Sequence, residues 1–226
     1  MNIIVSGASK GIGYQVALQA AELGHNVLAI ARNGELLDRL KAKSNIITVL
    51  KIDLVSDDGL ESIANWRNNV GKVDVLINNA GQLINKPFLD TSSTDFKNQF
   101  DANVVTAINL IQAVIPLMNQ RAHVLNITSM GGFQGSSKYA GLSAYSSSKG
   151  ALSVLTECLA EELKEHSIAV NALALGAVQT EMLESAFPGY AAPVSALEMA
   201  SYIIEFATSG HKFYNGQILP VTMGNP

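Results

Sequence analysis

The stretch NIIVSGASKGIG, residues 2–13, decides the fold of this chain. A short apolar run leads directly into three glycines with the spacing G-x-x-x-G-x-G, and a helical pattern at 11–23 follows. Such glycines allow a tight turn, let the backbone approach a pyrophosphate and permit close helix–strand packing, and the helix N-terminus attracts phosphate. A purely structural turn is the alternative. The residues that we expect to bind a dinucleotide here are Gly7, Ser9, Lys10, Gly11, Ile12 and Gly13.

The rest of the chain repeats this alternation of apolar runs and amphipathic segments. Strands are predicted at 2–6, 26–30, 46–52, 73–78, 123–128, 168–174 and 217–221, and helices at 11–23, 34–43, 57–70, 94–119, 143–166 and 195–208. Because parallel strands need crossover connections, the pattern predicts one doubly wound α/β domain of the Rossmann type over residues 1–226, with a seven-stranded, mostly parallel sheet and helices on both faces. Ligands should bind beyond the carboxyl ends of the strands.

Composition excludes several classes of protein. The 226 residues carry 15 Lys and Arg against 19 Asp and Glu, a net charge of −4, and 48% are hydrophobic, so the chain has a core and lacks a basic nucleic-acid surface. It has no run of 18 apolar residues and no signal-peptide pattern, so we expect a cytoplasmic protein without a membrane span. Cys158 is expected to be a small buried residue, His123 and His166 to be surface or capping residues, and no metal site is expected.

Two positive charges indicate which dinucleotide binds. Proteins that bind NAD usually place an acid about 20 residues beyond the glycines, whereas an Arg suits the 2′-phosphate of NADP. Here Arg32 follows the second strand, and Lys10 lies in the glycine turn. NADP(H) is therefore the preferred cofactor, unless both side chains are merely solvated cations. In Asp53-Leu54, which end the third strand, Asp53 is expected to bind the adenine amino group or to cap the next helix.

Ser129 and the segment Tyr145-Ser146-Ser147-Ser148-Lys149 carry the groups for proton transfer. Tyr145 and Lys149 are four residues apart and share a helical face, so the ammonium should lower the pKa of the phenol toward the range of a general acid or base. Ser129 follows the fifth strand and can donate a hydrogen bond to a substrate oxygen. Taken singly, the Tyr could be a packed helical side chain and the Ser a turn residue.

With Asn78-Asn79-Ala80-Gly81 after the fourth strand and Asn103 in a helix, these motifs resemble, in order and register, those of the classical short-chain dehydrogenase/reductase family. The resemblance implies a catalytic tetrad of Asn103, Ser129, Tyr145 and Lys149, in which Asn103 holds a water of a proton relay and Lys149 also binds the nicotinamide ribose. It implies a homodimer or homotetramer built on helices 94–119 and 143–166. The further cofactor contacts that it implies are Asn79, Ala80, Gly81, Gly176, Val178 and Thr180.

Three departures from that family limit the prediction to a reaction class. Leu175 stands where the family usually has a Pro, and the 130–142 loop is longer than in the family. The 180–195 segment is shorter than in the family, and FPGYAAPVS interrupts any helix in it, so we expect this segment to leave the site open. We expect an NADP(H)-dependent reductase that interconverts a small-molecule carbonyl and a secondary alcohol, acting on 3-oxoacyl thioesters, small ketones or aldehydes, or pteridine-like heterocycles. The alternatives are an NAD-dependent alcohol dehydrogenase and a non-enzymatic NADP-binding regulator.

Overall fold

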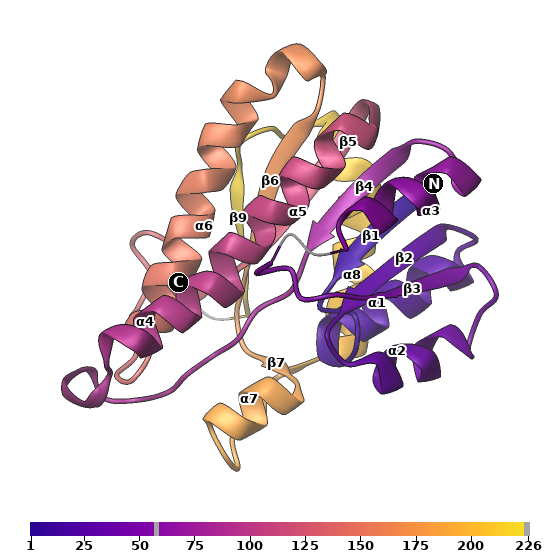
Figure 1. Ribbon diagram of the computed structural model, residues 1–226. Helices are drawn as coiled ribbons and strands as arrows, with labels where there is room; N and C mark the ends of the chain where they lie inside the picture. Colours follow the sequence, from indigo (N-terminus) through magenta and orange to yellow (C-terminus); the bar gives the residue numbers. More distant parts are fainter. Residues whose placement is uncertain (57–58, 224–226) are drawn as a thin grey trace.

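A seven-stranded sheet with the strand order β3-β2-β1-β4-β5-β6-β9 forms the centre of the computed structural model, which describes residues 1–56 and 59–223 (Figure 1). Every neighbouring pair of its strands is parallel. The predicted doubly wound fold is therefore confirmed. The strands are β1 Asn2–Ser6, β2 Asn26–Ala31, β3 Ile47–Lys51, β4 Val73–Asn78, β5 Met118–Ser129, β6 Ala169–Leu175 and β9 Ile218–Val221.

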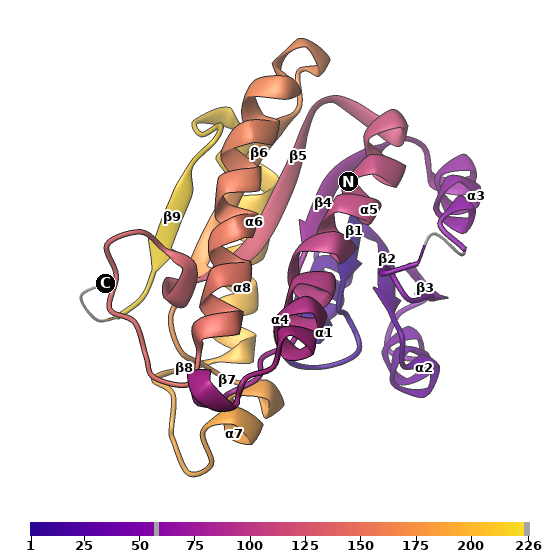
Figure 2. The same cartoon turned by 60° about the vertical axis from the view of Figure 1, so that its left-hand side comes forward.

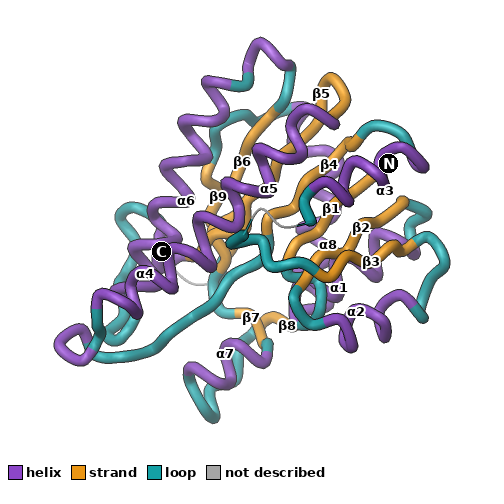
Figure 3. Tube along the Cα trace, viewed as in Figure 1, coloured by secondary structure: helices purple, strands orange, loops and turns teal. Residues whose placement is uncertain are grey.

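Helices cover both faces of this sheet, as Figures 2 and 3 show. Successive strand residues point to opposite faces, so Ile3 and Val5 pack in one core with α1, α2 and α8, whereas Ile4 packs in the other with α3, α5 and α6. The sheet is thus buried on both sides, which the continuous apolar strands required. The helices are α1 Gly11–Glu22, α2 Gly34–Lys41, α3 Glu61–Val70, α4 Ser93–Phe100, α5 Thr106–Val114, α6 Ser143–Glu162, α7 Glu181–Ala186 and α8 Ala196–Ser209.

The helix predicted at 94–119 is a composite. Between α4 and α5 the backbone makes a π-helical turn, Asp101–Val105, and a 3-10 turn, Ile115–Leu117, ends the run. An 18-residue window within the run Ser93–Leu117 has a mean hydropathy of 1.4, so by length and composition alone this helix could cross a membrane. Core helices of soluble proteins pass the same test, and α5 packs into the core against the sheet.

Four other predictions need correction or restriction. His123 is completely buried rather than a surface or capping residue, because β5 begins five residues earlier than predicted and carries it into the core. Cys158 is exposed rather than buried. The 180–195 segment contains the helix α7, because the helix-breaking Pro188 comes only after its end. The helix predicted at 57–70 begins at Glu61, and residues 57 and 58 of that prediction lie outside the described residues.

His123 is held as a neutral imidazole. Its Nδ1 donates to the carbonyl oxygen of Ala207 at 2.9 Å, and its Nε2 accepts from the side-chain amide of Asn171 at 3.0 Å. A proton on Nε2 would face that N–H donor inside the core. Burial, the largest cause, lowers the pKa of His123 from 6.5 to about 4. The unfolded state therefore binds more protons than the folded state between these two values, and the folded state loses stability as the pH falls through this window.

Replacing His123 with Gln should remove most of this decrease in stability with falling pH. From the two pKa values, the wild-type chain should lose about 2 kcal/mol of unfolding free energy from this group between pH 7 and pH 5. Urea unfolding at both pH values would measure the loss. The exposed His166→Gln variant should retain the wild-type difference. If His123→Gln lost as much unfolding free energy between pH 7 and pH 5 as the wild-type chain, this role for His123 would be contradicted.

Candidate active site

The glycine turn after β1 is tied to the end of β4 by four hydrogen bonds. The Ser6 Oγ accepts from the backbone N–H groups of Asn79 and Ala80, both at 3.1 Å. The side-chain amide of Asn79 donates in return to the carbonyl oxygens of Ser6 at 3.1 Å and Gly7 at 3.3 Å. Gly7 has φ +67°, and a Cβ on Gly13 would lie 2.4 Å from the Asn79 amide nitrogen and the Gly7 oxygen. Only glycine allows this close packing.

One cavity of about 1360 Å³ runs along the carboxyl ends of the strands, from the glycine turn to the start of α6. Most of the predicted site residues line it, so the tertiary structure brings together groups that are far apart in the sequence. Gly13 and Asn103 are the exceptions, since both lie behind the wall. The predicted residues in the lining are Gly7, Ser9, Lys10, Gly11, Ile12, Arg32, Asp53, Leu54, Asn79, Ala80, Gly81, Ser129, Tyr145, Lys149, Gly176, Val178 and Thr180.

The end of the cavity beside β2 and β3 is rich in positive charge. Lys10 and Arg32 line it as predicted, and Lys51, the last residue of β3, adds a third cation that the sequence analysis missed. Lys51 could have been found by the rule that ligands bind beyond the carboxyl ends of strands. The one carboxylate of α2 in this lining, Glu35, already pairs with Arg39 at 2.8 Å. These cations fit the phosphate-bearing end of a dinucleotide.

Asp53 closes a local turn at the same end of the cavity. Its Oδ1 accepts from the backbone N–H of Val55 at 3.1 Å, so it is not the cap of the next described helix, which starts at Glu61. The backbone oxygen of Leu54 accepts from the side chain of Asn109 at 2.9 Å, which anchors this turn on α5. Asp53 remains in the lining, where its second carboxylate oxygen can reach a ligand.

Ser129, Tyr145 and Lys149 meet at the other end of the cavity. Ser129 ends β5, and Tyr145 and Lys149 lie in the first two turns of α6. The ammonium of Lys149, which is only 4% exposed, donates to the backbone oxygen of Ile127 at 2.8 Å. The side chains of Tyr145 and Ser129 are hydrogen-bonded to each other. The three groups therefore share one corner at the end of β5.

The expected lowering of the Tyr145 pKa is wrong for this structure. Burial raises the pKa of the Tyr145 phenol, and the hydrogen bond with Ser129 only partly opposes this effect. Burial also lowers the pKa of Lys149 from 10.5 to about 8. Both shifts have the same cause, because loss of water disfavours the charged form of each group. At neutral pH the phenol is thus a proton donor beside an ammonium that is still mainly charged.

Asn103 lies in the π-helical turn and is completely buried behind this corner. Its Oδ1 accepts from the backbone N–H of Gln82 at 2.7 Å, and its Nδ2 donates to the oxygen of Gln82 at 3.0 Å and to the Ser148 Oγ at 2.8 Å. A Cβ on Gly81 would lie 2.8 Å from the Asn103 oxygen and 3.4 Å from the Lys149 nitrogen. The Asn103 side chain therefore holds the 81–82 backbone against Lys149.

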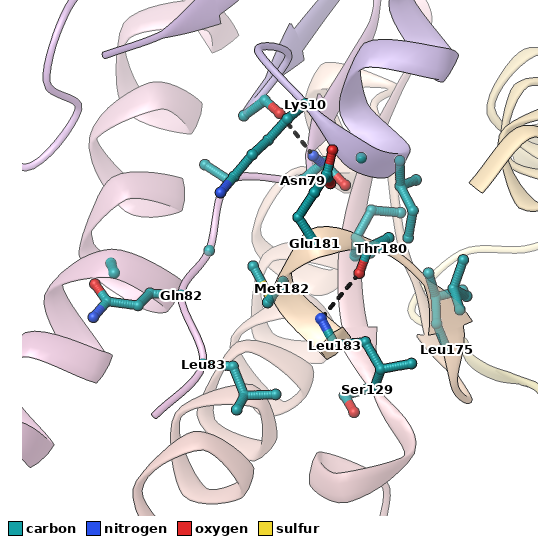
Figure 4. Close-up of a pocket in the computed structure, with 18 of the residues that line it drawn as sticks. Lys10, Asn79, Gln82, Leu83, Ser129, Leu175, Thr180, Glu181, Met182 and Leu183 are labelled. Carbon is teal, nitrogen blue, oxygen red and sulfur yellow. Dashed lines mark hydrogen bonds between the residues drawn. The ribbon is translucent and has the colours of Figure 1, made fainter. Parts of the chain in front are cut away.

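The segment after β6 forms the front wall of the cavity. The Thr180 Oγ1 caps α7 by accepting from the N–H of Leu183 at 3.2 Å (Figure 4). The side chain of Asn85 donates to the backbone oxygen of Ala186 at 2.8 Å. Two short strands, β7 Val178–Gln179 and β8 Val194–Ser195, close its base. The short 180–195 segment thus contributes a helix to the cavity wall. The wall residues that sequence analysis missed include Glu181, Met182, Phe187, Tyr190 and Pro193.

Comparison with known proteins agrees with this geometry. The profile of the short chain dehydrogenase family matches residues 1–191. The NADPH-dependent pterin aldehyde reductase of Arabidopsis thaliana is 33% identical over 217 residues, which cover 92% of this chain and 89% of that protein. Carbonyl reductase (NADPH) 2 of Sus scrofa is 34% identical over 183 residues, 80% of this chain and 73% of that protein.

Solved structures show the same fold. The 3-ketoacyl-(acyl-carrier-protein) reductase of Brucella melitensis, determined with NADH, superposes with a TM-score of 0.88 at 22% identity, covering 97% of this chain and 96% of that one. The glycine turn packed on Asn79, and Ser129, Tyr145 and Lys149 at the end of one cavity, are the arrangement that the resemblance implied. The chain belongs to the short-chain dehydrogenase/reductase family of oxidoreductases.

Proposed function

We propose that this protein is an NADP(H)-dependent reductase that converts a carbonyl compound to the alcohol. The observation that carries the proposal is the meeting of Ser129, Tyr145 and Lys149 at one end of a cavity whose other end holds the glycine turn and three cations. Proton-transfer groups and a dinucleotide-sized groove are both needed for reduction of a carbonyl. A bound nicotinamide would supply the hydride.

Tyr145 is the proton donor in this proposal. Because burial raises its pKa, the phenol is protonated at neutral pH and can give its proton to the carbonyl oxygen of the substrate. Ser129 orients that oxygen by a second hydrogen bond and stabilises the negative charge that develops on it. Lys149, which is held on Ile127 and lies one helical turn after Tyr145 on α6, would supply the positive charge that favours the phenolate remaining after the transfer. Asn103 keeps the neighbouring backbone in place.

Preference for NADP(H) rests on the positive end of the cavity. Arg32 and Lys10 face the site where the sequence lacks the acid typical of NAD binding. Guanidinium groups match phosphate geometry, so Arg32 is assigned to the 2′-phosphate. Two of the related proteins carry NADPH in their names, although the solved Brucella melitensis reductase was determined with NADH. NAD-dependent alcohol oxidation is the second candidate function.

We also propose a homodimer or homotetramer built on the outer faces of α4, α5 and α6. The apolar side chain of Val154 on α6 is 59% exposed, which would fit a symmetric contact. A Val154→Asp variant should lower the mass of the particle in light scattering. A wild-type protein that is already a monomer would contradict the proposal.

Replacing Tyr145 with Phe removes the proton donor and preserves the ring. We expect kcat for a reducible carbonyl to fall by about 10²- to 10⁴-fold, the usual contribution of general acid catalysis, while binding of NADPH measured by fluorescence stays within about twofold. Tyr202→Phe, on α8, is the matched control and should keep full activity. Full activity in Tyr145→Phe would disprove the mechanism. Tight NADPH binding with no turnover of any carbonyl in the wild-type protein would favour the non-enzymatic regulator.

Replacing Arg32 with Ser should weaken NADPH more than NADH. Loss of a charge-assisted hydrogen bond costs about 1.5 to 3 kcal/mol, so the Kd of NADPH should rise by roughly 10-fold or more, with little change for NADH. Arg39→Ser, on the following helix α2, where Arg39 pairs with Glu35, should change neither value. A wild-type protein that binds NADH as tightly as NADPH would favour the NAD-dependent alternative.

A further inference from the structure

The two halves of the cavity differ sharply in charge. The half beside β2 and β3 carries the cations described above together with Glu35 and Asp53. Among the described residues that line the other half, around Tyr145 and Ser129, Lys149 is the only charged side chain apart from Glu181. This contrast in charge affects which substrates can bind, because the part of the substrate next to its reacting carbonyl must fit in the half around Tyr145.

Neither of those two charged groups can hold an anion in the substrate half. Lys149 is directed to the backbone oxygen of Ile127 and belongs to the proton-transfer group. Glu181 points the other way along the wall, and its Oε2 lies 3.6 Å from the position that a Cβ on Gly11 would take. Figure 4 shows Glu181 beside Asn79 and Lys10, away from Ser129. Its negative charge would in any case repel an anionic substrate.

Two further lysines stand near the mouth, and both are already engaged. Lys86, which follows the 82–85 segment of the rim, pairs with Asp95 at 2.9 Å. Lys138, in the long loop after β5, donates to the Phe133 oxygen at 2.7 Å and to the Ser136 Oγ at 2.6 Å. These contacts shape the loop, and neither lysine lines the cavity. A carboxylate or phosphate close to the reacting carbonyl would therefore meet no cation free to pair with it among the described lining residues.

The substrate half instead offers flat and polarizable surfaces. Tyr139, 64% exposed, and Tyr190, 50% exposed, stand at its rim, and Phe187 lies on the wall between α7 and β8. Aromatic rings stack on such residues, and thioether sulfurs pack favourably against ring edges. The methionines in the cavity lining are Met130, Met182, Met199 and Met223.

Given the proposed reductase activity, on which this step rests, we infer that the substrate is an uncharged aldehyde or ketone with an aromatic body. The ring lies among the Tyr, Phe and Met side chains of the mouth, and the carbonyl oxygen reaches Tyr145 and Ser129. A carboxylate on the far side of the ring would lose part of its water at the rim without gaining a cationic partner, which is unfavourable. The cavity thus discriminates by charge as well as by shape.

A matched pair of aldehydes tests this inference. Methyl 4-formylbenzoate and 4-formylbenzoate have nearly the same shape and differ by one negative charge. With saturating NADPH and the full chain, we expect kcat/KM to favour the ester by roughly 10-fold or more. Equal values, or a preference for the carboxylate, would overturn the inference and leave the reductase standing. No turnover of these or other carbonyls with either NADPH or NADH would overturn both.

A charge placed at the rim provides a second readout. Tyr139→Lys should raise kcat/KM for the carboxylate relative to the ester by roughly threefold or more, since a rim cation can pair with it across partly exposed space. Tyr139→Gln, of similar length and without charge, should leave this ratio near its wild-type value. If both variants shift the ratio equally, charge does not decide selectivity and the inference is wrong.

Discussion

The structure depends on the contact between the ends of β1 and β4. Four hydrogen bonds join Ser6 and Gly7 to Asn79 and Ala80 across it, and these satisfy backbone groups that neither turn could satisfy alone. This is also the point at which the strand order reverses, because the chain passes from β1 outward to β3 and then returns to β4. The cavity opens at this reversal, so one contact sets both the glycine turn and the wall that faces it.

Loss of water governs the chemistry at the far end of the cavity. Burial favours the neutral form of both Tyr145 and Lys149, which raises one pKa and lowers the other. The hydrogen bond with Ser129 partly opposes the shift of Tyr145, and the Lys149 ammonium donates to the backbone oxygen of Ile127. The rest of the mouth has little charge of its own. This distribution of charge is the basis of the proposed preference for an uncharged substrate.

Local sequence patterns predicted the strands and most of the helices, because the spacing of apolar residues along a segment shows which of its faces is buried. They failed where a distant packing partner decides the outcome. The periodicity of β5 did not reveal that His123 faces Ala207 and Asn171 inside the core. Cys158 sits on a helix whose outward face could not be identified from its residues alone. The helix α7 is too short for a periodic signal and depends on its Thr180 cap.

The sequence by itself determined the doubly wound sheet and the glycine turn, and it indicated the groups that we propose move a proton, since these follow from residue type, spacing and chain order. Only the tertiary structure decided that burial raises the pKa of Tyr145, that Asn103 is engaged by Gln82 and Ser148, and that few charged side chains line the half of the cavity around Tyr145. The physical reason is that desolvation and the pairing of charges depend on which distant residues surround a group. Spacing along the chain does not carry that information.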